Sequence, residues 1–179
     1  MTQLNSKLDF RKHAKEVRKS LAISGLTIQK SAKIVSKILN SDEFKKAKNI
    51  AIYYPINGEI DLLGLLNVQD KDFYFPRTNN LDLEFVKYNK ACDLIDGTFG
   101  EKVPQGEAIN PDILDIIYLP ALLANKNNFR LGYGKGYYDR FLAKNAVHAL
   151  KVIVVANELI RDDFIQDEFD YKCHKIISA

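Results

Sequence analysis

One apolar run stands out in the chain, Asp115-Ile116-Ile117-Tyr118-Leu119-Pro120, and it ends at a proline. An unbroken run of this kind is typical of a strand that is buried on both faces of a parallel sheet. The segments 49–55 and 151–156 repeat the pattern, and residues 175–177 are a candidate for a last strand. We therefore expect a central sheet that is covered on both sides.

Segments with a helical period separate these runs. Residues 4–21 place their apolar side chains on one stripe, and a second helix is expected from Thr27, whose hydroxyl suits an N-cap. Asp61 is suited to cap a short helix over residues 62–66. Another helix is expected from Tyr137 to about Asn145, directly after a glycine-rich turn.

Two more strands, 73–76 and 83–88, are expected around a turn at Asn79-Asn80, and residues 96–111 are predicted to form a long loop. Strands that alternate with helices predict an α/β fold, a three-layer α/β/α sandwich around a mainly parallel, Rossmann-like sheet. Ligands of such sheets bind at the carboxyl ends of the strands. The loops to inspect therefore follow Tyr54, Phe75, Leu119 and Ala156.

The length and composition narrow the class of protein. The 179 residues suit a single domain over 1–179, and 26 Lys and Arg against 23 Asp and Glu leave a net charge of +3, too small to indicate nucleic acid or membrane binding. No apolar stretch approaches the roughly 20 residues of a membrane span, and residues 1–9 lack the apolar core of a signal peptide. Two cysteines, Cys92 and Cys173, fit a reducing compartment. We expect a cytoplasmic protein.

The strongest chemical signal is the segment 130–140, Arg-Leu-Gly-Tyr-Gly-Lys-Gly-Tyr-Tyr-Asp-Arg. Three glycines at alternate positions let backbone N–H groups face an anion, and the following helix adds its positive end. Lys135 and Arg130 supply positive charge for phosphate, and Asp139 could hold Mg²⁺ between phosphates. The alternative interpretation is a flexible turn in which Asp139 only complements the helix dipole.

The first helix carries four cations on one face, Lys7, Arg11, Lys15 and Arg18. Their spacing of four, eight and eleven residues from the first aligns them along the helix. A solvated helix surface is the commoner explanation of such a charge run, and an anion site is the functional one. The residues alone leave both interpretations open.

The segment 130–142 closely resembles the signature of the 5-formyltetrahydrofolate cyclo-ligase family, also called 5,10-methenyltetrahydrofolate synthetases. Four other segments occur in the family's order. They are Lys7-x-x-x-Arg11, residues 52–59, the Phe75-Pro76-Arg77 turn, and residues 115–120. The resemblance covers essentially the whole chain and implies a sheet topology like that of sugar isomerases and CoA-transferases.

The resemblance implies an ATP- and Mg²⁺-dependent ligase of one-carbon folate metabolism. In that reaction the formyl oxygen of 5-formyltetrahydrofolate takes the γ-phosphoryl group of ATP, and N10 closes the ring through an iminium phosphate. The partners it implies are small molecules, with neither nucleic acid nor membrane, and we expect a monomer.

The resemblance also implies roles for the residues of this chain that match the family's motif positions. Lys135, Arg130 and Tyr137 are the expected catalytic residues, and Lys15 and Arg18 are expected at the surface. The expected ATP contacts are Lys7, Arg11, Arg130, Leu131, Gly132, Tyr133, Gly134, Lys135, Gly136, Tyr137 and Tyr138. The expected folate contacts are Tyr54, Glu59, Tyr133 and Tyr137. The expected metal ligands are Asp139 and Asp170. Taken alone, Glu59 would be read as a turn residue on a solvated loop.

Two other functions are compatible with the scaffold. A non-catalytic nucleotide- or folate-binding protein would keep the glycine loop but lose the lysine or the metal ligand, and this chain has both Lys135 and Asp139. An RNA-associated protein would need aromatic residues among the cations of the first helix and a larger charge excess. Zinc is disfavoured because Cys173-His174 has no second ligand pair at suitable spacing.

Overall fold

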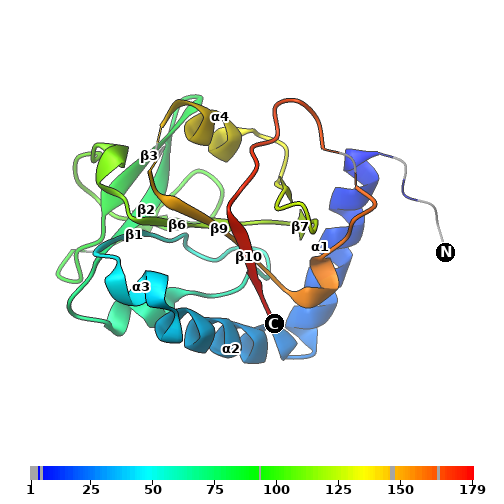
Figure 1. Ribbon diagram of the computed structural model, residues 1–179, viewed down its shortest axis with the longest axis horizontal. Helices are drawn as coiled ribbons and strands as arrows, with labels where there is room; N and C mark the ends of the chain where they lie inside the picture. Colours follow the sequence, from blue (N-terminus) through cyan, green and yellow to red (C-terminus); the bar gives the residue numbers. More distant parts are fainter. Residues whose placement is uncertain (1–3, 5, 93, 146–147, 165) are drawn as a thin grey trace.

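The apolar runs form a six-stranded sheet with the strand order β10-β9-β6-β1-β2-β3. The computed structural model describes residues 4, 6–92, 94–145, 148–164 and 166–179 (Figure 1). The strands are β1 (Asn49–Ala51), β2 (Asp72–Asn79), β3 (Asp82–Lys87), β6 (Ile116–Pro120), β9 (Leu150–Val155) and β10 (Lys175–Ser178).

All neighbouring strands of this sheet are parallel except β3, which pairs antiparallel with β2. The first four residues of β6 are buried, as are the last five of β9, because both strands lie in the middle of the sheet. The expected α/β fold with a mainly parallel sheet is confirmed. The expected strand 73–76 continues through Pro76 to Asn79, and its turn contains Asn80 with a positive φ of 55°.

Helices cover both faces of the sheet. The α-helices in the described part of the chain are α1 (Lys7–Ile23), α2 (Leu26–Asn40), α3 (Asp42–Lys46) and α4 (Tyr137–Lys144). In Figure 1, α2 and α3 lie below the sheet, α4 lies above it, and α1 stands at one side near β7 (Leu123–Ala124). This arrangement gives the expected three layers.

Several expected helix ends are different in the structure. The first helix begins at Lys7 rather than at residue 4, because the Ser6 side chain accepts a hydrogen bond from Asp9 N and caps it there; residue 5 lies outside the described residues. Thr27 is not an N-cap, since α2 begins at Leu26 after a left-handed Gly25. Asp61 is not the N-cap of the short helix that follows it, since Leu62 holds that position, although the Asp61 carboxylate accepts a hydrogen bond from Leu63 N at 2.7 Å.

That short helix is the 3-10 helix η1 (Leu63–Asn67). The segment predicted as a long loop, 96–111, instead contains most of a hairpin between β4 (Ile95–Asp96) and β5 (Lys102–Val103). Two further 3-10 turns are η2 (Pro111–Ile113) and η3 (Asn157–Leu159). Sequence periodicity does not detect strands of two residues, which explains the difference.

The strand order reverses direction at β1. The chain passes from β1 to β2 on one side, whereas β6 lies on the other side of β1. The carboxyl ends of β1 and β6 are therefore neighbours at a topological switch point, where open α/β sheets bind ligands. From the end of β6 the chain forms a hairpin of β7 and β8 (Arg130–Leu131), which leads directly into the glycine loop.

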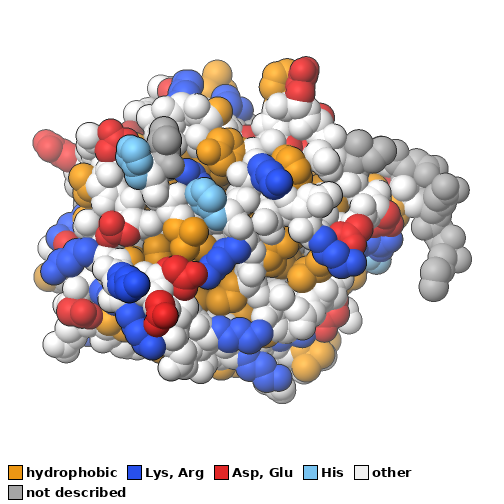
Figure 2. Space-filling model, viewed as in Figure 1, with side chains coloured by type: hydrophobic (Ala, Val, Ile, Leu, Met, Phe, Trp, Pro, Cys, Tyr) orange, Lys and Arg blue, Asp and Glu red, His pale blue; other side chains and the backbone are white. Residues whose placement is uncertain are grey.

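On the face shown in Figure 2, Lys and Arg side chains are mixed with Asp and Glu rather than gathered in a single field. This distribution agrees with the small net charge of +3. Within the described parts of the chain, no helix has the length and apolar character needed to cross a membrane.

The two cysteines differ in environment, which gives a simple test of the fold. Cys92 is exposed, whereas Cys173 is buried, and burial raises the pKa of the Cys173 thiol to about 11. Thiolate is the reactive form, so at pH 8 only about one Cys173 side chain in a thousand is reactive.

We expect one fast-reacting thiol with Ellman's reagent in the native protein and two in denaturant. In a Cys92→Ser variant the fast reaction should disappear; a fast thiol that persists would contradict this burial.

Candidate active site

The glycine loop, residues 132–136, joins β8 to α4 at the carboxyl side of β6. Gly134 has a φ of +95°, and a Cβ atom there would lie 3.0 Å from the Arg11 guanidinium carbon. Both the backbone conformation and the close approach of Arg11 therefore require glycine at this position. The N-cap of α4 is Gly136, whose φ of 68° also favours glycine and which makes no side-chain cap bond, so the positive end of the helix remains available to a ligand.

The basic face of α1 lies along this loop. The Arg11 side chain donates from Nε to Gly132 O at 3.0 Å, and Lys15 Nζ lies 5.9 Å from the centre of the Tyr133 ring. Lys7 forms ion pairs with two carboxylates of the C-terminal segment, Asp167 and Asp170, at 2.7 and 2.6 Å. Lys15 is exposed, as expected, whereas Lys7 and Arg11 are partly buried and are held by other parts of the chain.

Arg18 shows the largest difference from expectation. Arg18 is expected at the surface, but the residue is 3% exposed. Its guanidinium donates to Tyr133 Oη at 2.7 Å and to Ala121 O, and lies 3.5 Å from Glu59 Oε1. The sequence feature that could have indicated a role in the site is its position eleven residues after Lys7, on the same helix face as the cations assigned to ATP.

Glu59 lies at the switch point, beyond the end of β1, and is 5% exposed, which excludes a solvated turn. Tyr133 Oη donates to Oε1 at 3.2 Å, and the backbone N–H of Ile56 donates to Oε2 at 3.0 Å. Burial raises the pKa of Glu59 above its ordinary value, while the charge of Arg18 and these hydrogen bonds act against that rise. The carboxylate thus sits in a polar cluster beneath the loop.

Arg130 lies under the glycine loop, with a side chain that is 3% exposed. Its Nη2 donates to Asp139 Oδ1 at 2.9 Å, and its guanidinium carbon lies 5.1 Å from the centre of the Tyr138 ring. Its Nε atom has no hydrogen-bond partner among the described residues. In this structure Arg130 therefore supports the first turn of α4 from below.

The outer side of the loop carries Lys135, which is exposed. Arg140 fastens the loop by donating to Lys135 O at 2.9 Å and to Leu81 O at 2.7 Å. Tyr137 lies beside the β4–β5 hairpin, with its ring centre 5.8 Å from that of Phe99. Neither Arg140 nor Phe99 is among the site residues expected from the sequence, and only the glycine content of residues 96–111 marked the region of Phe99.

Three further residues that were expected in the site are Leu131, Tyr54 and Asp170. Leu131 is 2% exposed in the core, so its side chain is remote from any ligand on the loop surface. Tyr54 is half-buried beyond β1. Asp170 faces Lys7 at the start of α1, as described above.

The possible metal-ligating side chains of the site can be compared with the ligands that a metal ion needs. Among the residues that the structure describes, no three His, Cys, Asp or Glu side chains are grouped as a metal cage. Mg²⁺ is usually held by one or two carboxylates together with substrate phosphates. A half-buried Asp139 at the start of α4, with Oδ1 occupied by Arg130, fits an ion that arrives with a nucleotide.

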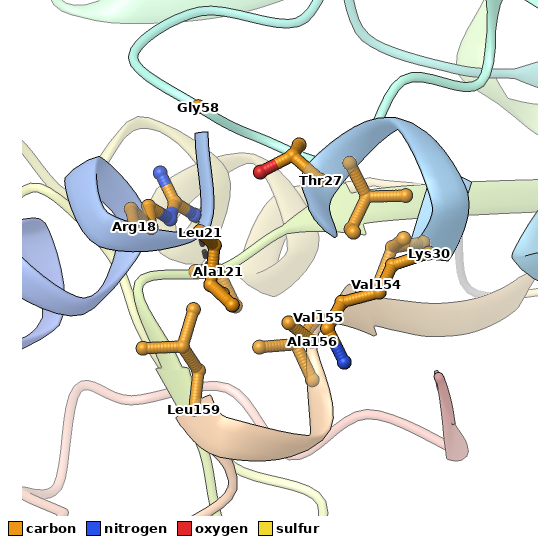
Figure 3. Close-up of a pocket in the computed structure, with 11 residues that line it drawn as sticks. Arg18, Leu21, Thr27, Lys30, Gly58, Ala121, Val154, Val155, Ala156 and Leu159 are labelled. Atoms are coloured by element: carbon orange, nitrogen blue, oxygen red, sulfur yellow. Dashed lines mark hydrogen bonds between the residues drawn. The ribbon is translucent and has the colours of Figure 1, made fainter. Parts of the chain in front are cut away.

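A small cavity lies behind Arg18, between α1, α2 and the end of β9 (Figure 3). Its volume is about 10 Å³, no more than one water molecule requires. Neither a nucleotide nor a folate can bind there.

The fold and the site define an α/β protein in which a glycine loop and the cations of a neighbouring helix lie at the switch point of the sheet. The chain matches the model of the 5-formyltetrahydrofolate cyclo-ligase family over residues 3–178. The 5-formyltetrahydrofolate cyclo-ligase of Mycoplasma genitalium is 34% identical over 135 residues, 73% of this chain and 72% of that protein. The mouse enzyme of the same name is 26% identical over 84% of this chain and 82% of its own length.

Solved structures agree. The NMR structure of Aquifex aeolicus 5,10-methenyltetrahydrofolate synthetase has a TM-score of 0.84 and 32% identity, covering 96% of this chain and 89% of that one. The synthetase from Mycoplasma pneumoniae, 23% identical with a TM-score of 0.79 over 97% and 98% of the two chains, shares the fold. The chain belongs to the 5-formyltetrahydrofolate cyclo-ligase family and is an enzyme of the ligase class.

Proposed function

We propose that the chain catalyses the ATP-dependent closure of 5-formyltetrahydrofolate to 5,10-methenyltetrahydrofolate, with release of ADP and phosphate. The observation that carries the proposal is the geometry of the glycine loop. It combines an exposed lysine, the N-terminus of α4 and the cations of α1, and Tyr133 of the same loop contacts the buried carboxylate of Glu59.

The reaction needs a good leaving group at the formyl carbon. The formyl oxygen attacks the γ-phosphorus of ATP, ADP departs, and an iminium phosphate remains. N10 then adds to the formyl carbon and loses its proton, and phosphate leaves with the former formyl oxygen. The protein must align the two substrates and neutralise charge on the transferred phosphoryl group.

We assign the nucleotide to the loop surface. Lys135 meets the γ-phosphate as a point charge, the backbone of residues 132–136 and the start of α4 meet the other phosphates, and Lys7 and Arg11 add charge from α1. Arg130 acts from below by holding Asp139. The assignment rests on the side of the loop that each group occupies.

We assign the folate to the switch point beside the loop. Glu59 is suited to accept hydrogen bonds from the amino and ring N–H groups of a pterin, because Oε2 accepts only one backbone N–H among the described residues. Tyr54, Tyr133 and Tyr137 are its proposed neighbours.

Asp139 is the proposed Mg²⁺ ligand, and Asp170 becomes a second one if Lys7 turns from it to a phosphate. When bound, Mg²⁺ neutralises charge on the phosphates and orients them. The residues of the chain contribute the carboxylate, and Arg130 fixes its direction through the 2.9 Å ion pair.

Asp139→Asn should raise the Mg²⁺ concentration for half-maximal rate by about tenfold or more, because an amide is a weaker ligand than a carboxylate. The measurement is a Mg²⁺ titration of the initial rate at saturating ATP. Asp70→Asn, which changes an exposed carboxylate remote from the loop, serves as the control. An unchanged titration curve would remove Asp139 from the metal site.

The proposed reaction is tested by mixing the purified protein with 5-formyltetrahydrofolate, Mg²⁺ and ATP and following the absorbance of the methenyl product. We expect product only when ATP is present. Binding of ATP and folate without product would favour a non-catalytic binding protein on the same scaffold. If neither ligand binds, the proposal fails.

A further inference from the structure

Arg18 is a buried charge to which the proposed chemistry gives no role. Its guanidinium contacts three other parts of the chain, namely Glu59 beyond β1, Ala121 beyond β6, and Tyr133 in the glycine loop. Removing a guanidinium from water is costly unless its donors are satisfied. A charge retained in such a place calls for an explanation beyond packing.

The position of Arg18 is set by the backbone. The loop after β1 packs directly on α1, because a Cβ atom at Gly58 would lie 3.3 Å from Arg18 O, and Gly58 has a φ of +72°. Glycine thus lets the residue before Glu59 approach the helix. The Arg18 side chain is thereby held beside the carboxylate.

The surroundings leave Arg18 few other partners. Behind it lies the small cavity of Figure 3, whose wall is largely apolar and includes Leu21, Val154 and Leu159. The polar groups that the guanidinium meets among the described residues are those of Glu59, Ala121 and Tyr133. The orientation of the Arg18 side chain is therefore set by its contacts with these three residues.

Tyr133 connects this cluster to the loop surface. The residue is 37% exposed, and its hydroxyl accepts from Arg18 and donates to Glu59. A ligand that orders the glycine loop also fixes this hydroxyl, and with it the direction of the carboxylate. Oε2 of Glu59 accepts only one backbone N–H among the described residues, so the carboxylate keeps acceptor capacity besides its bond from Tyr133.

We propose that Arg18 is a positioning residue that couples the two substrate sites, so that nucleotide on the glycine loop and folate at Glu59 strengthen each other's binding. The inference rests on the proposed function. Coupling of this kind is reciprocal and commonly amounts to five- to a hundredfold in affinity. Arg18 contacts neither reacting atom and acts through Tyr133 and Glu59.

The direct test is the affinity of a non-hydrolysable ATP analogue with Mg²⁺, measured by calorimetry with and without saturating 5-formyltetrahydrofolate. In the wild type we expect folate to tighten analogue binding by about fivefold or more. In Arg18→Lys and in Tyr133→Phe this ratio should fall towards one, whatever the affinity of each variant for either ligand alone. Tyr133→Phe removes only a hydroxyl, so it remains informative if Arg18→Lys does not fold.

Lys19→Met is the matched control, because Lys19 is an exposed cation next to Arg18 on α1 and away from the cluster. It should keep the wild-type ratio. A wild-type ratio of one, or a full ratio in both Arg18→Lys and Tyr133→Phe, would overturn the coupling. A wild type that turns over folate without coupling leaves the proposed function intact, whereas a wild type that binds neither substrate ends both.

The pH profile separates positioning from a merely structural role. The groups that face Glu59 are Arg18 and the phenols of Tyr53, Tyr133 and Tyr138, whose raised pKa values keep them neutral in the working range. Arg18→Met removes the positive charge, so the pKa of Glu59 rises further and the acid limb of kcat/KM moves to higher pH. Arg18→Lys retains the charge and should leave the limb in place. An equal loss at every pH in Arg18→Met would contradict positioning.

Discussion

Replacing Lys135 by alanine is expected to lower kcat by about a hundred- to a thousandfold and to leave the stability of the protein nearly unchanged. Lys135 is the exposed cation of the glycine loop, between two glycines whose positive φ angles shape the turn. In the proposed reaction its ammonium group meets charge that grows on the γ-phosphoryl group as the bond to ADP breaks. An interaction that strengthens in the transition state raises kcat rather than substrate affinity alone.

The measurement is a comparison of kcat, KM for ATP and the unfolding midpoint in urea. Lys33→Ala is a suitable control, because Lys33 is an exposed lysine on α2, which covers the opposite face of the sheet from α4. Arginine at position 135 keeps the charge and should recover part of the rate. If Lys135→Ala turned over at nearly the wild-type rate, the assignment of the γ-phosphate to this lysine would be wrong.

Replacing Arg130 by methionine is expected to lower the free energy of unfolding by about 2–4 kcal/mol and to reduce activity as well. The guanidinium is 3% exposed and is paired at 2.9 Å with Asp139, whose side chain is 22% exposed. The variant leaves that carboxylate without its cation. The positive end of α4 compensates only in part, since a helix terminus contributes about 0.3–1 kcal/mol.

A double-mutant cycle measures the pair. Arg130→Met leaves the carboxylate of Asp139 unpaired, and Asp139→Asn removes that charge. The double variant should therefore be more stable than the sum of the two single losses predicts. Urea unfolding of the four proteins gives the coupling directly. Strict additivity would mean that the ion pair does not hold the start of α4, and that Arg130 acts on stability through packing on Tyr138 alone.

Local sequence patterns were sufficient to predict the parallel sheet and the glycine-rich turn. Unbroken apolar runs at 49–55, 115–120 and 151–156 predict parallel strands, since only burial on both faces permits such runs. The alternation of glycines in 130–136, followed by a helix, predicts the anion-binding turn for an equally local reason, because positive φ angles and a free helix end depend on neighbouring residues. These features need no knowledge of distant contacts.

The tertiary structure alone decided which side chains surround that turn. Arg18 looks like one more solvated cation on α1, and only the packing of the loop after β1 against the helix buries it beside Glu59. Likewise Phe99 meets Tyr137 through a hairpin too short to have a detectable period. The periodicity of a helix shows which residues share a face but not what covers that face. That choice depends on strand order and loop closure, which join residues far apart in the chain.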